Sequence, residues 1–208
     1  IAKELGQADL GDPRRSARLE QVAERLLVRP GVSLPRAMGD EAALEAAYRF
    51  LGNHDVELAA ILAPHVAATA ERVCAEGTAY CISDTTEFRF GGVGREGLGP
   101  SQGGGRGFLS HIGLAVAADG SRLPLGVLSL ENIVRPEEPK GRRKTKKSRG
   151  AADSESLKWE RGVLAAEKAL GGRASLIHLM DREADIYAHL AKMTARSIRF
   201  VARVAQNR

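Results

Sequence analysis

The stretch Ala79–Phe88, AYCISDTTEF, is the one around which we expect the rest of the chain to fold. Its apolar first half predicts a short strand buried on both faces, ending at Asp84. A second apolar run, Ser175–Asp181 (SLIHLMD), also ends at an aspartate. Functional groups in mixed α/β sheets cluster just beyond the carboxyl ends of strands. We therefore predict that Asp84 and Asp181 meet in space.

Two converging carboxylates predict a site for a divalent cation. The carboxylates repel each other, and a cation relieves this repulsion while it uses their oxygens as ligands. Hard oxygen ligands without histidine or cysteine favour Mg²⁺ or Mn²⁺. Two such ions about 3.5 to 4 Å apart could activate a water or a 3′-hydroxyl and stabilise the departing oxygen of a phosphodiester.

The alternative is that these aspartates only cap helices. Asp181 is followed by Glu183 and Asp185, which suit the first turn of a helix without any metal. Capping explains Asp84 less well, because the residues Thr85, Thr86 and Glu87 that follow it do not begin an obvious helix.

The composition is that of a globular, mildly basic protein. The chain has 208 residues, of which 43% are hydrophobic, enough for one core or a core plus a small domain. Its 31 Lys and Arg against 26 acidic residues give a formal charge of +5, which is compatible with a polyanionic partner. Cys74 and Cys81 have no zinc or disulfide spacing, and the N-terminus lacks the apolar stretch of a signal peptide. No apolar run approaches the roughly 18 residues of a membrane span. We expect a cytoplasmic protein without a membrane partner.

The first part of the chain is predicted to be helical. Asp12 can cap a helix with Pro13 in its first turn, and Pro30 with Gly31 ends it. Pro64 is expected to kink or break a later helix. The predicted helices lie at residues 13–28, 40–51 and 56–75. We expect a helical domain over residues 1–76 and an α/β domain over residues 77–208.

After Gly77 the hydrophobic period changes to that of strands. The turn AADGSR separates two apolar runs and predicts a hairpin. The predicted strands and helices follow one another in the order strand 79–84, strand 110–117, strand 123–130, helix 155–170, strand 176–181, helix 184–194 and strand 198–204.

Two loops in this domain are rich in glycine or in basic residues. Nine of the 17 residues in Gly91–Gly107 are glycine, and Gly92, Gly94 and Gly97 spell GxGxxG. A dinucleotide site is excluded because no helix opens immediately afterwards, so we predict a flexible loop. Lys140–Arg149 has seven Lys or Arg in ten residues, which predicts a solvated loop that can still contact a nucleic-acid backbone.

Five stretches together resemble a known family, the DDE transposases of the cut-and-paste bacterial type represented by transposon five (Tn-five) and insertion sequence four. The matching stretches are LGDPRRSARL (Leu10–Leu19), AYRF (Ala47–Phe50), SDTTEF (Ser83–Phe88), ESLKW (Glu155–Trp159) and DREADIY (Asp181–Tyr187). They occur in the family's order and are spread over most of the chain. Lys158 and Trp159 lie in one of them, and the sequence assigns them no role.

The resemblance implies a helical domain that binds the transposon end, followed by a catalytic domain of ribonuclease-H-like fold with a mixed β-sheet. By motif position Asp84 matches the first catalytic, Mg²⁺-binding carboxylate and Asp181 the second. The family's third carboxylate is a downstream glutamate that has no match here. We therefore expect an incomplete catalytic domain, which binds DNA better than it cuts it.

The implied partner is double-stranded DNA, both transposon ends and target, bound by a homodimer of the full-length protein at the nucleoid. One alternative is a truncated DNA-binding or inhibitory derivative without catalysis. Another is an unrelated metal-dependent nuclease or phosphatase, but Thr86 stands where an aspartyl-phosphate phosphatase has its second aspartate. The residues expected to contact DNA are Arg14, Arg15, Arg18, Tyr48 and Arg49, with Arg203 and Arg208 near the metal site.

Overall fold

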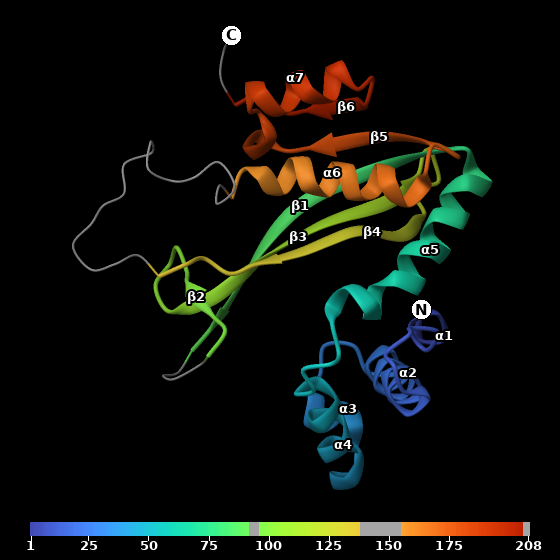
Figure 1. Cartoon of the computed structure of the whole chain (residues 1–208), viewed down its shortest axis with the longest axis vertical. Helices are drawn as coiled ribbons and strands as arrows, with labels where there is room; N and C mark the ends of the chain where they lie inside the picture. The colour runs from blue at the N-terminus through green and yellow to red at the C-terminus, as the bar shows by residue number, and fades with distance from the viewer. Residues whose placement is uncertain (92–95, 138–154, 206–208) are drawn as a thin grey trace. The chain divides into compact units, whose positions relative to one another are not determined.

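The computed structural model describes residues 1–91, 96–137 and 155–205, and the chain divides into two compact units, Ile1–Ala68 and Thr69–Arg208 (Figure 1). The division lies inside helix α5 (Leu58–Glu76), whereas the predicted domain boundary at residue 76 falls at the end of that helix.

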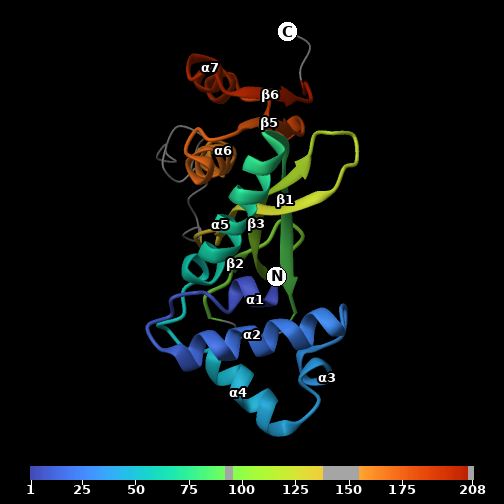
Figure 2. The same cartoon turned by 90° about the vertical axis from the view of Figure 1, so that its right-hand side faces the viewer.

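Unit 1 is helical. Helix α2 lies between α1 on one side and α3 and α4 on the other (Figure 2). The predicted helices at α2 and α4 are confirmed, whereas the short α1 and α3 were not predicted because four or five residues carry too little periodicity. The helices of this unit before α5 are α1 (Ala2–Leu5), α2 (Pro13–Val28), α3 (Leu34–Met38) and α4 (Glu41–Leu51).

Local side-chain bonds set the starts of both longer helices. The Asp12 carboxylate accepts a hydrogen bond from the backbone N–H of Arg14 at 2.9 Å, and Pro13 occupies the first helical position. Asp40 accepts from the N–H of Ala43 at 2.7 Å. These caps satisfy backbone donors that a helix start leaves unpaired. The helices then bury apolar stripes that contain Leu19, Phe50, Val22 and Ala47.

Helix α5 spans the division between the units as one helix with Pro64 inside it, so of the predicted kink or break the break is not present. Its end, with Ala70 and Val73, belongs to the core of unit 2. Contrary to the sequence expectation, α5 is long and apolar enough to cross a membrane by length and composition, the one such helix in the described ranges. Core helices of soluble proteins pass the same test, so this finding has little weight.

Unit 2 is built on a mixed sheet with the order β4-β3-β1-β5-β6, and the two-residue β2 also pairs with β3. Strands β1, β3 and β4 pair antiparallel, whereas β1, β5 and β6 run parallel (Figure 1). The prediction of an α/β protein with a helical N-terminal region and a mixed sheet is confirmed. The strands are β1 (Thr78–Phe90), β2 (Gly99–Pro100), β3 (Arg106–Ala117), β4 (Pro124–Ile133), β5 (Ser175–Met180) and β6 (Arg199–Ala202).

The predicted end of the first strand at Asp84 is wrong, because β1 continues to Phe90. Antiparallel pairing with β3 extends to the pair Phe90 and Arg106, whereas parallel pairing with β5 ends at Ile82 and Leu179. Asp84 therefore lies where the neighbouring strand β5 stops, on a strand that itself goes on.

The structure has two short elements where a single helix over residues 184–194 was predicted. A single 3₁₀ turn, η3 (Arg182–Ala184), precedes α7 (Tyr187–Ala195).

One face of the sheet is covered by α6 (Leu157–Leu170), α7 and the end of α5 (Figure 2). Alternation along β1 points Ala79, Cys81 and Ser83 into this covered face, where all three are buried. The even-numbered residues of β1 point to the opposite face, where the exposed fraction is 40% for Ile82 and 44% for Phe88. We call this second side, which carries Ile82, Asp84 and Phe88, the open face.

Some predicted features lie outside the described residues. These are Gly92 and Gly94 of the glycine-rich loop, the basic run Lys140–Arg149, and Arg208.

Candidate carboxylate site and DNA-binding surface

The sheet register brings Asp84 and Asp181 opposite each other. Ile82 of β1 lies opposite Leu179 of the parallel strand β5, so two residues further along each chain Asp84 is level with Asp181. Neighbouring strands are about 4.8 Å apart. Alternation from Ile82 and Leu179 also gives both aspartates the same side, the open face, and both are exposed.

Each of these aspartates uses one carboxylate oxygen to bond its own backbone. Oδ1 of Asp84 accepts from the N–H of Thr85 at 2.7 Å, and Oδ1 of Asp181 accepts from the N–H of Glu183 at 2.9 Å. Asp181 thereby caps η3, as the capping alternative predicted. These bonds fix the orientation of each carboxylate and leave the second oxygen, Oδ2, to bind another group.

The donor chemistry of this pair suits a hard cation. Both groups are carboxylates, both are exposed, and each is held by a single backbone N–H, so Oδ2 can act as a ligand without losing an existing bond. Within residues 1–91, 96–137 and 155–205, no three His, Cys, Asp or Glu side chains gather closely enough to hold a metal ion by themselves. Asp84 and Asp181 would therefore be two ligands among others supplied by water or substrate.

Arg203 follows β6 at the same level of the sheet. Val201 lies opposite Leu179, and the N–H of Arg203 donates to the carbonyl of Met180 at 3.0 Å, which is the parallel pattern that puts Arg203 beside Asp181. Arg203 is exposed. The row Asp84, Asp181 and Arg203 thus combines two acidic side chains and one basic side chain at one level of neighbouring strands.

The residue after Asp84 is supported from the covered face by a buried histidine that was not predicted from the sequence. His111 of β3 is 1% exposed, and its Nδ1 is 2.9 Å from the hydroxyl oxygen of Thr85. Its ring packs edge-on against Trp159 of α6, with the ring centroids 4.7 Å apart. The signal was present in SHIGLAVA, where alternation gives His111 the same side as Gly113 and Ala115.

The environment keeps His111 neutral. Burial, followed by the ammonium of Lys158, lowers the pKa of His111 to about 4, although the carboxylates of Glu131 and Asp84 act in the opposite direction. His111 is thus within electrostatic range of both Asp84 and Lys158.

The arginines of α2 that are expected to contact DNA differ in exposure and in the hydrogen bonds that their side chains already make. Arg14 is exposed in the first turn of α2. Arg15 is held, because its guanidinium donates to the carbonyl of Leu10 at 2.9 Å and to the Asp55 carboxylate at 2.6 Å. Arg18 is half-buried and donates to the Gln21 side chain at 3.1 Å.

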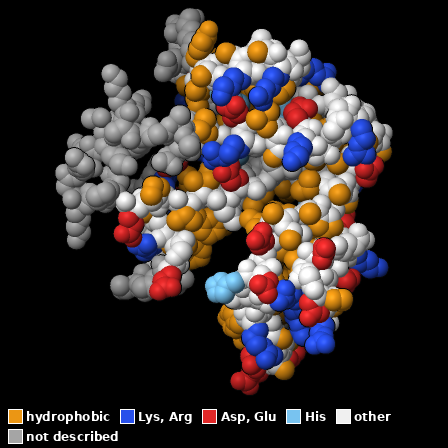
Figure 3. Space-filling view, in the orientation of Figure 1, with side chains coloured by type: hydrophobic (Ala, Val, Ile, Leu, Met, Phe, Trp, Pro, Cys, Tyr) orange, Lys and Arg blue, Asp and Glu red, His pale blue; other side chains and the backbone are white. Residues whose placement is uncertain are grey.

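The two predicted DNA contacts on α4 are exposed. Tyr48 is 54% exposed, and Arg49 makes a loose ion pair with Glu45 at 3.8 Å on the same helix. In the view of Figure 3, Lys and Arg side chains of unit 1 are interspersed with acidic ones, so this side of the unit is not a uniformly basic patch. Contact with phosphates would then rest on individual side chains such as Arg14 and Arg49.

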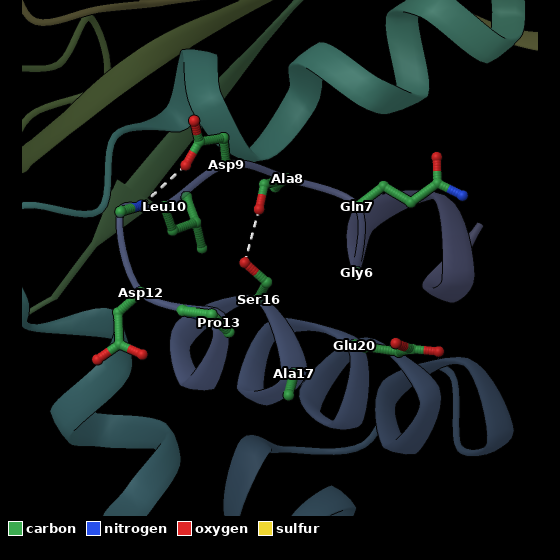
Figure 4. A pocket seen from close by; sticks show the side chains of 11 residues that line it. Gly6, Gln7, Ala8, Asp9, Leu10, Asp12, Pro13, Ser16, Ala17 and Glu20 are labelled. Carbon is green, nitrogen blue, oxygen red and sulfur yellow. Dashed lines mark hydrogen bonds between the residues drawn. The ribbon is translucent and has the colours of Figure 1, made fainter.

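Unit 1 also contains a shallow cavity of about 520 Å³ between the loop after α1 and the first half of α2 (Figure 4). Two of its acidic side chains, Asp9 and Asp12, have local structural roles. Asp9 accepts from the N–H of Gly11 at 3.1 Å, and Asp12 caps α2. The hydroxyl of Ser16 donates to the carbonyl of Ala8 at 2.6 Å, which closes the loop onto the helix. The cavity therefore results from how this loop folds, and its acidic lining does not favour phosphate.

Residues 1–56 match a protein-family model described as "Transposase DNA-binding". The matched region extends over α1 to α4 and contains Arg14, Arg15, Arg18, Tyr48 and Arg49. This match supports a transposase whose N-terminal region binds DNA, and it supports DNA as the partner.

Proposed function

We propose that the protein is a DDE transposase of the Tn-five and insertion-sequence-four type, which binds transposon-end DNA with unit 1 and uses Asp84 and Asp181 in metal-dependent cleavage and strand transfer. The observation that carries the catalytic part is the shared register of Asp84 and Asp181 at the end of β5. The family match over residues 1–56 carries the DNA-binding part.

The strand order supports a ribonuclease-H-like catalytic domain. Three antiparallel strands, β4, β3 and β1, adjoin two parallel strands, β5 and β6, and α6 connects the two groups in sequence. This is the element order that the family resemblance implies.

In the proposed mechanism Asp84 and Asp181 would hold Mg²⁺ or Mn²⁺ through their Oδ2 atoms. A bound divalent ion supplies Lewis-acid chemistry and lowers the pKa of a coordinated water or hydroxyl. The backbone N–H groups of Thr85 and Glu183 keep the two carboxylates oriented toward the open face. Arg203, level with Asp181, would bind the negatively charged phosphodiester beside them.

Unit 1 would bring the DNA to this site. Arg14 and Arg49 would contact phosphates, and the exposed ring of Tyr48 would contact the sugar or a groove edge. Arg15 and Arg18 would contribute less, because both already hold partners within unit 1. As part of the proposal, the protein acts as a homodimer on DNA at the nucleoid in the cytoplasm.

The test combines duplex binding with nicking of supercoiled plasmid, which needs no knowledge of the transposon-end sequence. We expect duplex binding without metal, plasmid nicking only with Mg²⁺ or Mn²⁺, and loss of nicking in Asp84→Asn and Asp181→Asn. Binding without nicking would favour the second candidate, a DNA-binding derivative without catalysis. Nicking that survives both substitutions would refute the assignment of these carboxylates.

A further inference from the structure

Lys158 is a buried cation whose burial is not explained by contacts within its own helix. It is 5% exposed, and it is the second residue of α6. Removing an ammonium from water is unfavourable, and a positive charge in the first turn of a helix opposes the helix dipole. Lys158 therefore needs a compensating partner outside its own helix.

That partner is Glu183, in the turn that follows Asp181. The Lys158 ammonium donates to Oε2 of Glu183 at 3.0 Å, and it lies 5.8 Å from the centre of the Trp159 ring. The Glu183 side chain is 63% exposed, so the contact reaches from the interior beneath α6 to the surface beside η3.

Glu183 is also bonded through its backbone to the carboxylate of Asp181. Its N–H donates to Asp181 Oδ1 at 2.9 Å, and the next N–H, of Ala184, donates to the Asp181 carbonyl at 3.2 Å. Ala184 is fully buried. Any movement of Glu183 would therefore shift the donor that orients the Asp181 carboxylate.

We propose that Lys158 is a positioning residue, whose ammonium holds Glu183 and thereby fixes the turn that orients the Asp181 carboxylate toward the metal. This inference rests on the proposed metal-binding role of Asp84 and Asp181. It gives the Lys158 position of the ESLKW stretch a physical role. The lysine acts on the site from beneath the sheet and does not touch the metal or the DNA.

The experiment replaces Lys158 with methionine, which has a similar length and no charge. Loss of an outer contact that orients a ligand typically weakens metal binding about 10- to 100-fold. We expect Lys158→Met to weaken Mn²⁺ binding at least tenfold by calorimetric titration. Hydrogen exchange at the Glu183 and Ala184 amides should become faster. The melting temperature should not fall, because the exposed Glu183 carboxylate stays hydrated and a buried charge is removed.

Lys192→Met is the matched control. Lys192 makes an ion pair between α7 and α6, with Glu160 at 2.8 Å, and its side chain is 55% exposed. Its removal should leave both Mn²⁺ affinity and exchange at η3 unchanged.

A double-substitution cycle separates positioning from general destabilisation. Because Lys158 acts through Glu183, adding Glu183→Ala to Lys158→Met should cause no further loss of Mn²⁺ affinity. Additive losses, or wild-type affinity in Lys158→Met, would overturn the inference alone. If the unaltered protein does not bind Mn²⁺, or if Asp84→Asn and Asp181→Asn leave its Mn²⁺ binding intact, the proposed metal function fails. This inference then fails with it.

Discussion

Neighbouring arginines in the first turn of α2 have different physical situations. The guanidinium of Arg15 joins the loop at Leu10 to the Asp55 carboxylate, and its side chain is 28% exposed. Arg14 is exposed and has its backbone N–H, not its side chain, in the cap of the helix. The Arg15 side chain therefore stabilises the fold, whereas the Arg14 side chain extends into solvent, where the proposed contact with DNA can form.

We predict that Arg15→Ala lowers the free energy of unfolding by about 1 kcal/mol, because it removes a carbonyl hydrogen bond and an ion pair that is partly solvated. Arg14→Ala should change it by less than about 0.5 kcal/mol. Chemical denaturation followed by circular dichroism measures both. Equal losses in the two variants would contradict the distinction.

The buried His111 predicts a pH dependence of stability. Burial and Lys158 lower its pKa to about 4 from the ordinary 6.5, with Arg161 acting in the same direction and Glu131 and Asp84 opposing. Between these pH values the unfolded chain binds a proton that the folded chain does not. The free energy of unfolding should therefore be highest above pH 6.5 and fall by about 3 kcal/mol as the pH is lowered to 4.

His111→Gln provides the comparison, since glutamine has a similar size and does not titrate. Unfolding measured by denaturant at several pH values between 4 and 7 should show a smaller slope in the variant than in the unaltered protein. If the two slopes are the same, His111 does not carry this dependence.

The helix starts of unit 1 could be predicted from sequence because their determinants are local. Asp12 with Pro13, and Asp40 before an alanine-rich run, cap α2 and α4 through bonds that span two or three residues. The hairpin of β3 and β4 was also predictable, since a turn separates two apolar runs. In each case the deciding contacts lie within a few residues along the chain.

The features that were not predicted depend on distant partners. The extension of β1 from Asp84 to Phe90 is fixed by its pairing with β3, which continues to the pair Phe90 and Arg106. The burial of Lys158 depends on Glu183, which is 25 residues further along the chain. The sequence predicted that Asp84 and Asp181 meet, but their shared level on the open face follows from the register of β1 with β5.

The packing of α5 against β4 depends on the absence of a side chain at one position of β4. Gly126 of β4 has φ of +138°, and an added Cβ would collide with the hydroxyl of Thr69 on α5. Beside it, the guanidinium of Arg72 donates to the carbonyl of Leu125 at 2.6 Å. Close approach of the helix end to this strand therefore requires glycine.

We predict that Gly126→Ala lowers the free energy of unfolding by about 3 kcal/mol, through backbone strain together with displacement of α5. Gly120→Ala is the matched control, because Gly120 also has a positive φ, +92°, but a Cβ added there would meet no other atom within 4 Å. It should cost about 1 kcal/mol. Equal effects in thermal unfolding would show that strain alone, and not the contact with α5, sets the requirement.

The two units predict separable functions for the whole molecule. The family match assigns DNA binding to residues 1–56, so we expect phosphate contacts from unit 1 in addition to the proposed contact of Arg203 at the metal site. Each phosphate contact that is lost reduces the slope of log Kobs against log salt by about 0.9. Arg14→Ala should show that reduction while Mn²⁺ binding stays unchanged.

The double variant Asp84→Asn with Asp181→Asn should show the opposite of Arg14→Ala, with Mn²⁺ binding lost and DNA binding retained. It removes two negative charges from the open face, so duplex affinity should stay equal or rise, while Mn²⁺ binding is lost. Fluorescence anisotropy across a salt series and calorimetric titration with Mn²⁺ measure the two properties on the same samples. If either variant impairs both properties, DNA binding and metal binding are not carried by separate units. The assignment of DNA binding to α2 and α4, and of metal binding to Asp84 and Asp181, would then be incorrect.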